Sequence, residues 1–313
     1  MNTQSNAIAE SFDAPGASPA ALLPTRPLYW SVRRELWEYR SIYVAPLIAA
    51  AVYLLGYSIS LIWLPRSVRL LVALHPVDQR VQLAMPYAHA GMLITATAFI
   101  VGIFYCLDAL HGERRERSIL FWKSLPVSDR TTVLSKAGIP FVVLPLLVFA
   151  STVILQLIML LLSGAVLLVS GASSATPWAP PLFEMQLVLF YGLTVMLLWH
   201  APIYCWMLLV SGWARRATFL WAVLPPLAIA TLEYIAFHTS HLGSLLQNRL
   251  FGFTASAFDL TDKAGVPIDP HFIPLAQLAP GRFLSSPGLW MGLIFAALCL
   301  AAAVRLRRYQ GPF

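Results

Sequence analysis

The segment ERRERSILFWKSLPVSDRTTVLSK, from Glu113 to Lys136, is rich in charged residues and lies between two long stretches that contain none. These apolar stretches cover residues 88–107 and 137–169. A helix of about 20 apolar residues is long enough to cross the roughly 30 Å hydrocarbon core of a bilayer. We therefore predict that both stretches span a membrane and that the charged segment is part of the loop joining them.

The composition of the 313-residue chain indicates a membrane protein throughout. Hydrophobic residues make up 58% and charged residues only 11%, and the mean hydropathy is +0.71, far from the balance of a soluble domain. We predict an all-α polytopic membrane protein with a six-span transmembrane domain at residues 42–304. The spans are expected at residues 42–64, 88–107, 137–169, 187–210, 217–237 and 289–304.

Two of the predicted spans have unusual lengths. The third is longer than a bilayer requires and carries Pro140 and Pro145 near its start, which predicts a tilt or a break before the span proper. The sixth is short. It crosses if the chain before Leu289 contributes and the arginines after it extend toward the membrane surface.

The basic residues predict the orientation. With a cytoplasmic N-terminus, 15 of the 21 Lys and Arg residues fall on the cytoplasmic side: four before the first span, six at 111–137, two between the fourth and fifth spans, and three after the sixth. We therefore expect both termini in the cytoplasm, with a cytoplasmic loop at 108–136, an outer segment at 239–288 and a cytoplasmic tail at 305–313. Basic residues beside anionic lipid explain the net charge of +7 without a nucleic-acid partner.

Residues 1–25 contain acidic residues, Pro and Ser but no basic region before an apolar core. We expect a disordered cytoplasmic tail there rather than a cleaved signal peptide. The three cysteines, Cys106, Cys205 and Cys299, all fall in predicted spans. They are expected to behave as small apolar residues, and no disulfide framework is indicated.

Residues 26–41 have the pattern of an amphipathic helix that lies in the membrane surface. Helical spacing places Leu36 among apolar side chains and Arg34 on the opposite side. The alternative is that this stretch is only the polar flank of the first span, because aromatic and Arg side chains anchor most span ends. The residues assigned to the interfacial helix are Tyr29, Trp30, Arg33, Arg34, Leu36 and Trp37.

No motif for nucleotide binding or covalent catalysis occurs in the chain: GxxxxGK[ST], GxGxxG, HExxH and GxSxG are all absent. We predict no catalytic, cofactor or metal residues. His238 and His241 are spaced i, i+3, and Asp259 or Asp262 could complete a metal site. Histidines at the end of a span are more often interfacial side chains.

Three polar residues inside predicted spans are candidates for a substrate path or a subunit interface: Glu233, Gln156 and His200. A carboxylate in an apolar span costs roughly 2.5 to 3.5 kcal/mol on insertion scales, so Glu233 should face a partner or an aqueous cavity. The alternative is that it reaches water at the outer end of its span. Gln156 and His200 are of types that usually hydrogen-bond a neighbouring helix.

The loop at 108–136 combines charged and apolar residues. A charged run is expected to extend the second span as a helix out of the membrane, and an apolar patch at 119–125 then stops at Pro126. Ser128 can cap a second helix that leads through 131–136 into the third span. A solvated loop has no reason to carry so many large apolar groups, so the patch is expected on the membrane surface or in a groove of another protein.

This order of features resembles the membrane subunits of ATP-binding-cassette exporters of the ABC2 permease type. The matching features are an acidic and Arg-rich cluster at 113–117, Ser118, an apolar patch at 119–122, Leu-Pro-Val-Ser at 125–128, and a helix ending on Lys136. The resemblance extends in outline over the whole chain, through the interfacial helix, the six spans and the outer segment.

The resemblance implies that the loop couples the chain to a separate cytoplasmic ATPase. Two ATPase copies would bind ATP and Mg, and a second copy of this chain would complete the path in a bacterial plasma (inner) membrane. The residues assigned to the ATPase-coupling interface are Glu113, Arg114, Arg117, Ser118, Ile119, Phe121, Trp122, Lys123, Leu125 and Pro126.

We therefore expect a permease subunit of an ATP-driven exporter, which does not hydrolyse ATP itself. The apolar and aromatic spans favour a lipid-like, peptidic or hydrophobic drug-like substrate. Two alternatives stay open. A secondary transporter or channel needs titratable groups near the membrane midplane and usually internal repeats, and Glu233 alone is present. A membrane-embedded enzyme needs paired catalytic groups, and His200 has no obvious carboxylate partner.

Overall fold

The computed structural model describes residues 27–71, 76–116, 128–171, 180–260 and 273–309. Within these ranges the chain is helical, and the only strand-like pairing there is an isolated antiparallel bridge between Phe258 and Leu278. The protein is an all-α polytopic membrane protein, as the composition predicted. Six helical segments of this part of the chain are long and apolar enough to cross a bilayer: Ser41–Ser60, Gln79–Arg115, Asp129–Val169, Leu182–Trp213, Thr218–Phe237 and Pro287–Tyr309.

The described helices fall into two groups along the chain. The first group is α1 (Pro27–Glu38), α2 (Ser41–Ser60), α3 (Leu64–Leu71), α4 (Pro76–Asp108) and α5 (His111–Arg115). The second is α7 (Asp129–Gly138), the π-helical turn η1 (Ile139–Val143), α8 (Leu144–Val169), α9 (Leu182–Trp213), α10 (Thr218–Phe237), α11 (His241–Phe251), α12 (Phe253–Ala257), the 3-10 turn η2 (Leu275–Gln277), α13 (Pro280–Ser285) and α14 (Pro287–Tyr309).

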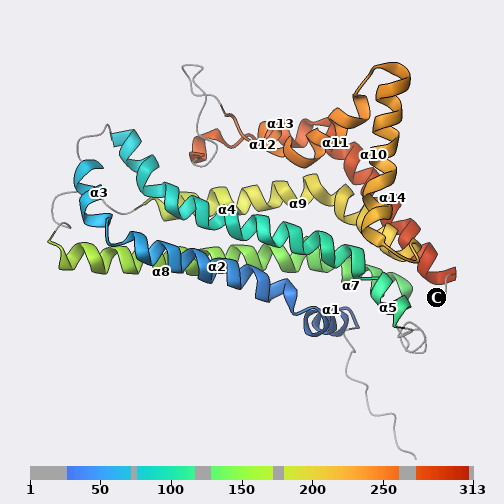
Figure 1. The fold of residues 1–313 in the computed structure, drawn as a ribbon, viewed down its shortest axis with the longest axis horizontal. Coiled ribbons are helices and arrows are strands. Elements are labelled where there is room, and N and C mark those ends of the chain that lie inside the picture. The colour runs from blue at the N-terminus through green and yellow to red at the C-terminus, as the bar shows by residue number, and fades with distance from the viewer. Residues whose placement is uncertain (1–26, 72–75, 117–127, 172–179, 261–272, 310–313) are drawn as a thin grey trace, which may run out of the picture.

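Four helices form the body of the molecule. α2, α4, α8 and α9 run along its long axis, and α14 packs along α9 (Figure 1). α1 crosses the bundle at the end where α5, α7 and the C-terminal end of α14 meet. α10 rises away from the bundle nearly crosswise, and α11 returns from its far end toward α9. Of the side chains of α10, only Ala222 is buried.

The third predicted span is part of a longer continuous rod. α7 runs through η1 into α8, so Asp129–Val169 is one helical segment of 41 residues. The N–H of Leu144 bonds to the carbonyl of Ile139, five residues back. Pro140 and Pro145 cannot donate a backbone hydrogen bond, and a local π turn absorbs such a defect. The predicted break is therefore replaced by a widened turn that keeps the helix continuous.

Other helix ends also differ from the predicted spans. The first span was expected to reach residue 64, but α2 ends at Ser60 and a separate helix, α3, begins at Leu64. α4 begins well before residue 88, and α14 continues past residue 304 to Tyr309. An apolar stretch ends at its first charged residue, whereas a helix continues as long as its charged side chains find partners or solvent.

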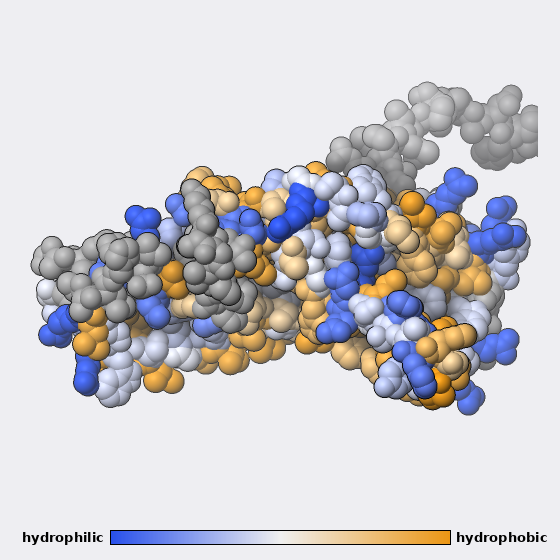
Figure 2. All heavy atoms as spheres, turned by 90° about the horizontal axis from the view of Figure 1, so that it is seen from above, coloured by the Kyte–Doolittle hydropathy of each residue, from blue (hydrophilic) through white to orange (hydrophobic). Residues whose placement is uncertain are grey.

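Large apolar side chains are exposed along the body of the molecule. Figure 2 shows apolar atoms along one long edge. A soluble monomer rarely exposes a contiguous apolar patch of more than a few hundred Å², so contact with lipid accounts for this surface. Exposed members include Leu55, Ile59, Ile100, Ile154 and Leu161.

At Gly102, α4 packs closely against α8 and α9. A Cβ atom added there would lie 3.0 Å from Cε1 of Tyr204 in α9 and 3.1 Å from Cδ1 of Leu144 in α8. Small residues at such points let membrane helices pack closely. By contrast, a Cβ at Gly56 would meet nothing within 4 Å.

We expect Gly102→Leu to lower the free energy of unfolding by about 1–3 kcal/mol, because overpacking forces neighbouring side chains or backbone to shift. Gly56→Leu is the matched control and should cause no loss. Unfolding of both variants in detergent measures the difference. Equal losses in the two variants would contradict the packing described for α4, α8 and α9.

Candidate functional site

A cluster of charged side chains lies where α1, α5, α7 and α14 meet (Figure 1). It contains three basic and three acidic side chains from four helices. The cluster links α5 to α7, the two helices on either side of the loop that carries most of the predicted ATPase interface. We call it the charge cluster; its members are Arg34, Glu35, Glu113, Asp129, Lys136 and Arg307.

Lys136 lies at the centre of the charge cluster. Its Nζ atom is 2.9 Å from Oε1 of Glu35 and 3.1 Å from Oε1 of Glu113. The exposed fractions of the Lys136, Glu35 and Glu113 side chains are 0%, 0% and 1%. Charged side chains are almost never buried to this degree unless they are paired. The helices that carry these three side chains can therefore pack against one another only when the ion pairs are formed.

Two arginines complete the pairing of the carboxylates. Nη2 of Arg34 donates to Oε1 of Glu35 at 2.6 Å and to Oε1 of Glu113 at 2.8 Å. Nη1 of Arg307 donates to Oε2 of Glu113 at 2.5 Å, and its Nε lies 3.3 Å from Oδ1 of Asp129. Glu113 of α5 is thereby held by cations from α1, α7 and α14.

Tyrosines extend this network to α4. The hydroxyl of Tyr105 donates to Oε2 of Glu35 at 2.9 Å, and the hydroxyl of Tyr39 donates to Asp108 at 3.2 Å. Burial alone would lower the pKa of Arg34, but the carboxylates beside it, Glu35 first, outweigh this effect and raise the pKa. The guanidinium of Arg34 therefore stays charged. The two tyrosine hydrogen bonds fix α1 to the end of α4.

The turn between α4 and α5 is anchored on the C-terminal end of α9. Oγ of Ser211 accepts hydrogen bonds from the backbone N–H groups of Leu110 at 3.0 Å and His111 at 2.9 Å. Nη1 of Arg114 donates to the carbonyl of Gly212 at 2.5 Å. These bonds satisfy backbone groups that helix ends leave unpaired. α5 is thus held by α9 as well as by the charge cluster.

The structure describes two of the predicted ATPase-interface residues. Glu113 and Arg114 are buried within the chain, so neither side chain is exposed for contact with a partner. Ser128 caps α7 as predicted, because its Oγ accepts from the N–H of Thr131 at 3.1 Å. The remaining interface residues lie outside the described residues: Arg117, Ser118, Ile119, Phe121, Trp122, Lys123, Leu125 and Pro126.

α1, predicted as an interfacial helix, has two distinct sides. Arg34 reaches the charge cluster, and Leu36 packs against the core. On the exposed side, Cζ of Arg33 lies 5.3 Å and 4.8 Å from the ring centroids of Trp30 and Trp37. Aromatic and basic side chains of this kind suit the headgroup region of a membrane. The exposed aromatic side chains of α1 are Tyr29, Trp30 and Trp37.

Glu233 caps the helix that follows its own. One carboxylate oxygen accepts from the N–H of His241 at 2.8 Å and from the hydroxyl of Thr239 at 3.0 Å, and the other accepts from the N–H of Leu242 at 2.8 Å. A carboxylate is favoured at a helix N-terminus by both the unpaired N–H groups and the helix dipole. The N-terminus of α11 therefore satisfies the carboxylate of Glu233, and no substrate path is needed to explain this charge in an apolar helix.

Gln156 and His200 also bond to neighbouring helices. Nε2 of Gln156 donates to the carbonyl of Tyr87 at 2.9 Å, and Nε2 of Gln186 donates to Oε1 of Gln156, which joins α8 to α4 and α9. A ring nitrogen of His200 lies 3.2 Å from the carbonyl of Leu250 in α11. Neither residue belongs to the charge cluster.

No group of three His, Cys, Asp or Glu side chains in the described ranges is placed to hold a metal ion. His241, considered as a ligand from the sequence, is the first residue of α11. Asp262 lies outside the described residues. The three cysteines are buried free thiols.

Sequence reasoning missed most of the charge cluster. Glu35, Asp129 and Arg307 had no assigned role, and Lys136 entered only as the end of a helix in the resemblance. Lys136 directly precedes the third predicted span, and Arg307 follows the sixth. Glu35 carried the clearest signal, because it adjoins Leu36 on the side of the amphipathic helix that was expected to be apolar. Which opposite charge it meets depends on how four separate helices assemble.

Comparisons with protein-family models, curated proteins and solved structures gave no match. The charges of the charge cluster pair with one another, and Lys136 at its centre is fully buried. Such an arrangement joins helices mechanically, and it leaves its central amine no access to an external ligand.

We expect Lys136→Met to lower the free energy of unfolding by roughly 3–5 kcal/mol, because it leaves the carboxylates of Glu35 and Glu113 buried with less compensation. Arg115→Met is the control. Arg115 pairs with Glu116 on the surface, where such a pair contributes at most about 1 kcal/mol. Thermal unfolding in detergent measures both. A Lys136→Met variant as stable as Arg115→Met would show that the charge cluster does not hold these helices.

Proposed function

We propose that this protein is the permease subunit of an ATP-driven exporter, coupled to a separate ATPase through the loop between α5 and α7. The observation that carries the proposal is the buried charge cluster. It joins both helices bounding this loop to α1 and to the C-terminal end of α14. A force applied to the loop would therefore act on four helices at once rather than on a flexible connection.

The continuous rod from α7 to α8 supports the transmission of such a movement. Asp129–Val169 is one continuous helical segment, so a rotation of α7 also rotates α8. Rigid-body motion of packed helices about an interface is an established way to switch between two states. In the proposed cycle, closure of two ATPase subunits moves the loop, and α8 carries the movement to the far end of the bundle.

The orientation follows from the same features. α1, the charge cluster and the loop lie at one end of the bundle, and most Lys and Arg residues of the chain adjoin that end in the predicted topology. We assign this end to the cytoplasm, where ATP is present. The exposed aromatic side of α1 would then lie in the inner surface of a bacterial plasma membrane.

The sequence also fits a division of labour with a partner. The chain carries no phosphate-binding GxxxxGK[ST] motif, so we assign ATP and Mg binding to the partner ATPase. A second copy of this chain would complete the substrate path. Only Ala222 of α10 is buried, and its large apolar side chains are mostly exposed, which leaves a long apolar helix available for lipid or for that copy.

We expect Phe121→Ala combined with Trp122→Ala to weaken binding of the ATPase at least roughly thirtyfold. The two aromatics, flanked by Glu116 and Lys123, have the composition of an apolar anchor with a charged rim, and truncating such an anchor typically costs about 2 kcal/mol or more. Co-purification of the ATPase with the full-length chain, and its hydrolysis rate, measure the effect.

The matched control for this experiment is Trp30→Ala combined with Trp37→Ala. It removes two exposed aromatics from α1 and should leave ATPase affinity unchanged. Normal co-purification and normal hydrolysis with the loop variant would place the docking site elsewhere. Failure to recover any ATPase with the unaltered chain would favour a secondary transporter, a channel or a membrane-embedded enzyme instead.

A further inference from the structure

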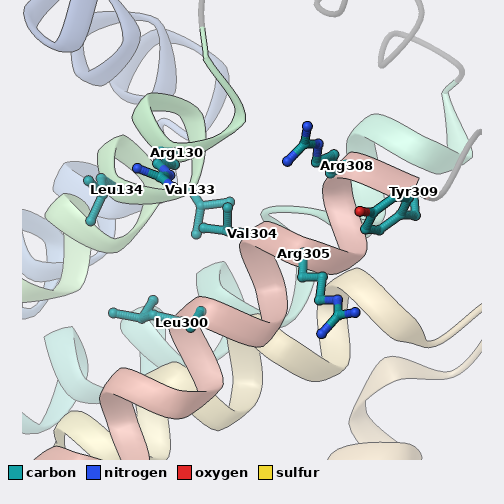
Figure 3. A pocket seen from close by; sticks show the side chains of 9 residues that line it. Arg130, Val133, Leu134, Leu300, Val304, Arg305, Arg308 and Tyr309 are labelled. Atoms are coloured by element: carbon teal, nitrogen blue, oxygen red, sulfur yellow. The ribbon is translucent and has the colours of Figure 1, made fainter.

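A cavity of about 560 Å³ opens between α7 and α14, beside the charge cluster. Its volume lies within the roughly 300–1,000 Å³ typical of small-molecule sites. Figure 3 shows side chains of α7 on one side and of α14 on the other. The cavity is therefore a gap between two helices that are already joined at the charge cluster by Arg307 and Asp129.

The lining of the cavity has two chemically different parts. Leu134 of α7 and Leu300, Ala301 and Val304 of α14 give an apolar wall. Arg130 from the first turn of α7 and arginines from the last turns of α14 give a basic one. The cavity thus offers both an apolar surface and positive charge within one space.

The arginines of this cavity have no acidic partners among the described residues. Arg307 pairs with Glu113 and Asp129, whereas no described carboxylate forms an ion pair with Arg130 or Arg308. In Figure 3 the guanidinium of Arg308 lies on the side of α14 nearer Arg130, while Arg305 points the other way. Arg130 and Arg308 therefore concentrate positive charge at one end of the cavity.

We propose that this cavity binds one anionic phospholipid, with its phosphate between Arg130 and Arg308 and an acyl chain along the apolar wall. The arginines adjoin the ends of apolar helices, which is the depth of lipid headgroups, and basic pockets between membrane helices are suited to anionic headgroups. A general excess of basic residues on one side of the membrane explains the arginines but not the adjoining cavity. A soluble anion would not need the apolar wall.

The lipid would bridge the same two helices that Arg307 and Asp129 connect. Its binding would therefore stabilise the contact of α7 with α14 and make the charge cluster sensitive to the lipid composition of the membrane. This inference rests on the described side chains and holds whether or not the protein is an exporter.

Native mass spectrometry of the full-length chain in neutral detergent tests the proposal, with dioleoyl phosphatidylglycerol and dioleoyl phosphatidylcholine as probes. We expect one phosphatidylglycerol to bind at least tenfold more tightly than phosphatidylcholine. Arg130→Gln with Arg308→Gln should weaken phosphatidylglycerol binding roughly thirtyfold, since each basic residue near an anionic lipid contributes roughly fivefold. Arg215→Gln with Arg216→Gln removes the same charge from another exposed site and should leave affinity unchanged.

A second variant separates the cavity from a general charge effect. Ala301 is exposed in the cavity wall, and Ala301→Trp should fill the apolar part and weaken phosphatidylglycerol binding at least tenfold while keeping every arginine. Both cavity variants should elute and melt like the unaltered chain. Equal affinity for the two lipids, equal effects of the two arginine pairs, unchanged affinity in Ala301→Trp, or competition by inorganic phosphate at equal concentration would each overturn the proposal.

Discussion

A charged side chain that is removed from water at the end of a membrane bundle requires an opposite charge within a few ångströms, because its desolvation costs several kcal/mol. Lys136 imposes this requirement here. Its amine is fully buried, and it reaches carboxylates from α1 and α5 at 2.9 and 3.1 Å. The positions of α1, α5, α7 and α14 are therefore coupled, since displacing any one of them leaves a buried charge with fewer partners.

The charge cluster is also connected to the long helices of the bundle. α7 continues into α8 without a break, and α5 is fixed to α9 through Ser211 and Arg114. The loop between α5 and α7 thus begins and ends on helices that the charge cluster joins to each other. Under the proposed function, the helices joined by the charge cluster receive the movement of the ATPase. Under the lipid proposal, a lipid bound between α7 and α14 stabilises the same helices.

The sequence predicted the features that depend on local chemistry. The six apolar segments, the helix at the N-terminal side of Ser41 and the Ser128 cap follow from helix length, periodicity and side-chain type. It did not predict features that depend on assembly. Glu35 and Arg307 are far apart in the chain, and both became cluster members only because α1 and α14 both pack against α7. The helical extension of α14 past residue 304 was missed for the same reason.

The central claim is that α1 and α5 move as one unit, and the distance between spin labels on these two helices in the membrane tests it directly. The native cysteines are buried, so labels attach to introduced ones at exposed Arg33 and Arg115 and, for the reference, at Leu232 of α10. The account predicts that the 33–115 distance stays the same with and without ATP in the complex with the ATPase, while the 115–232 distance changes. A change in the 33–115 distance as large as that in the reference pair would contradict it.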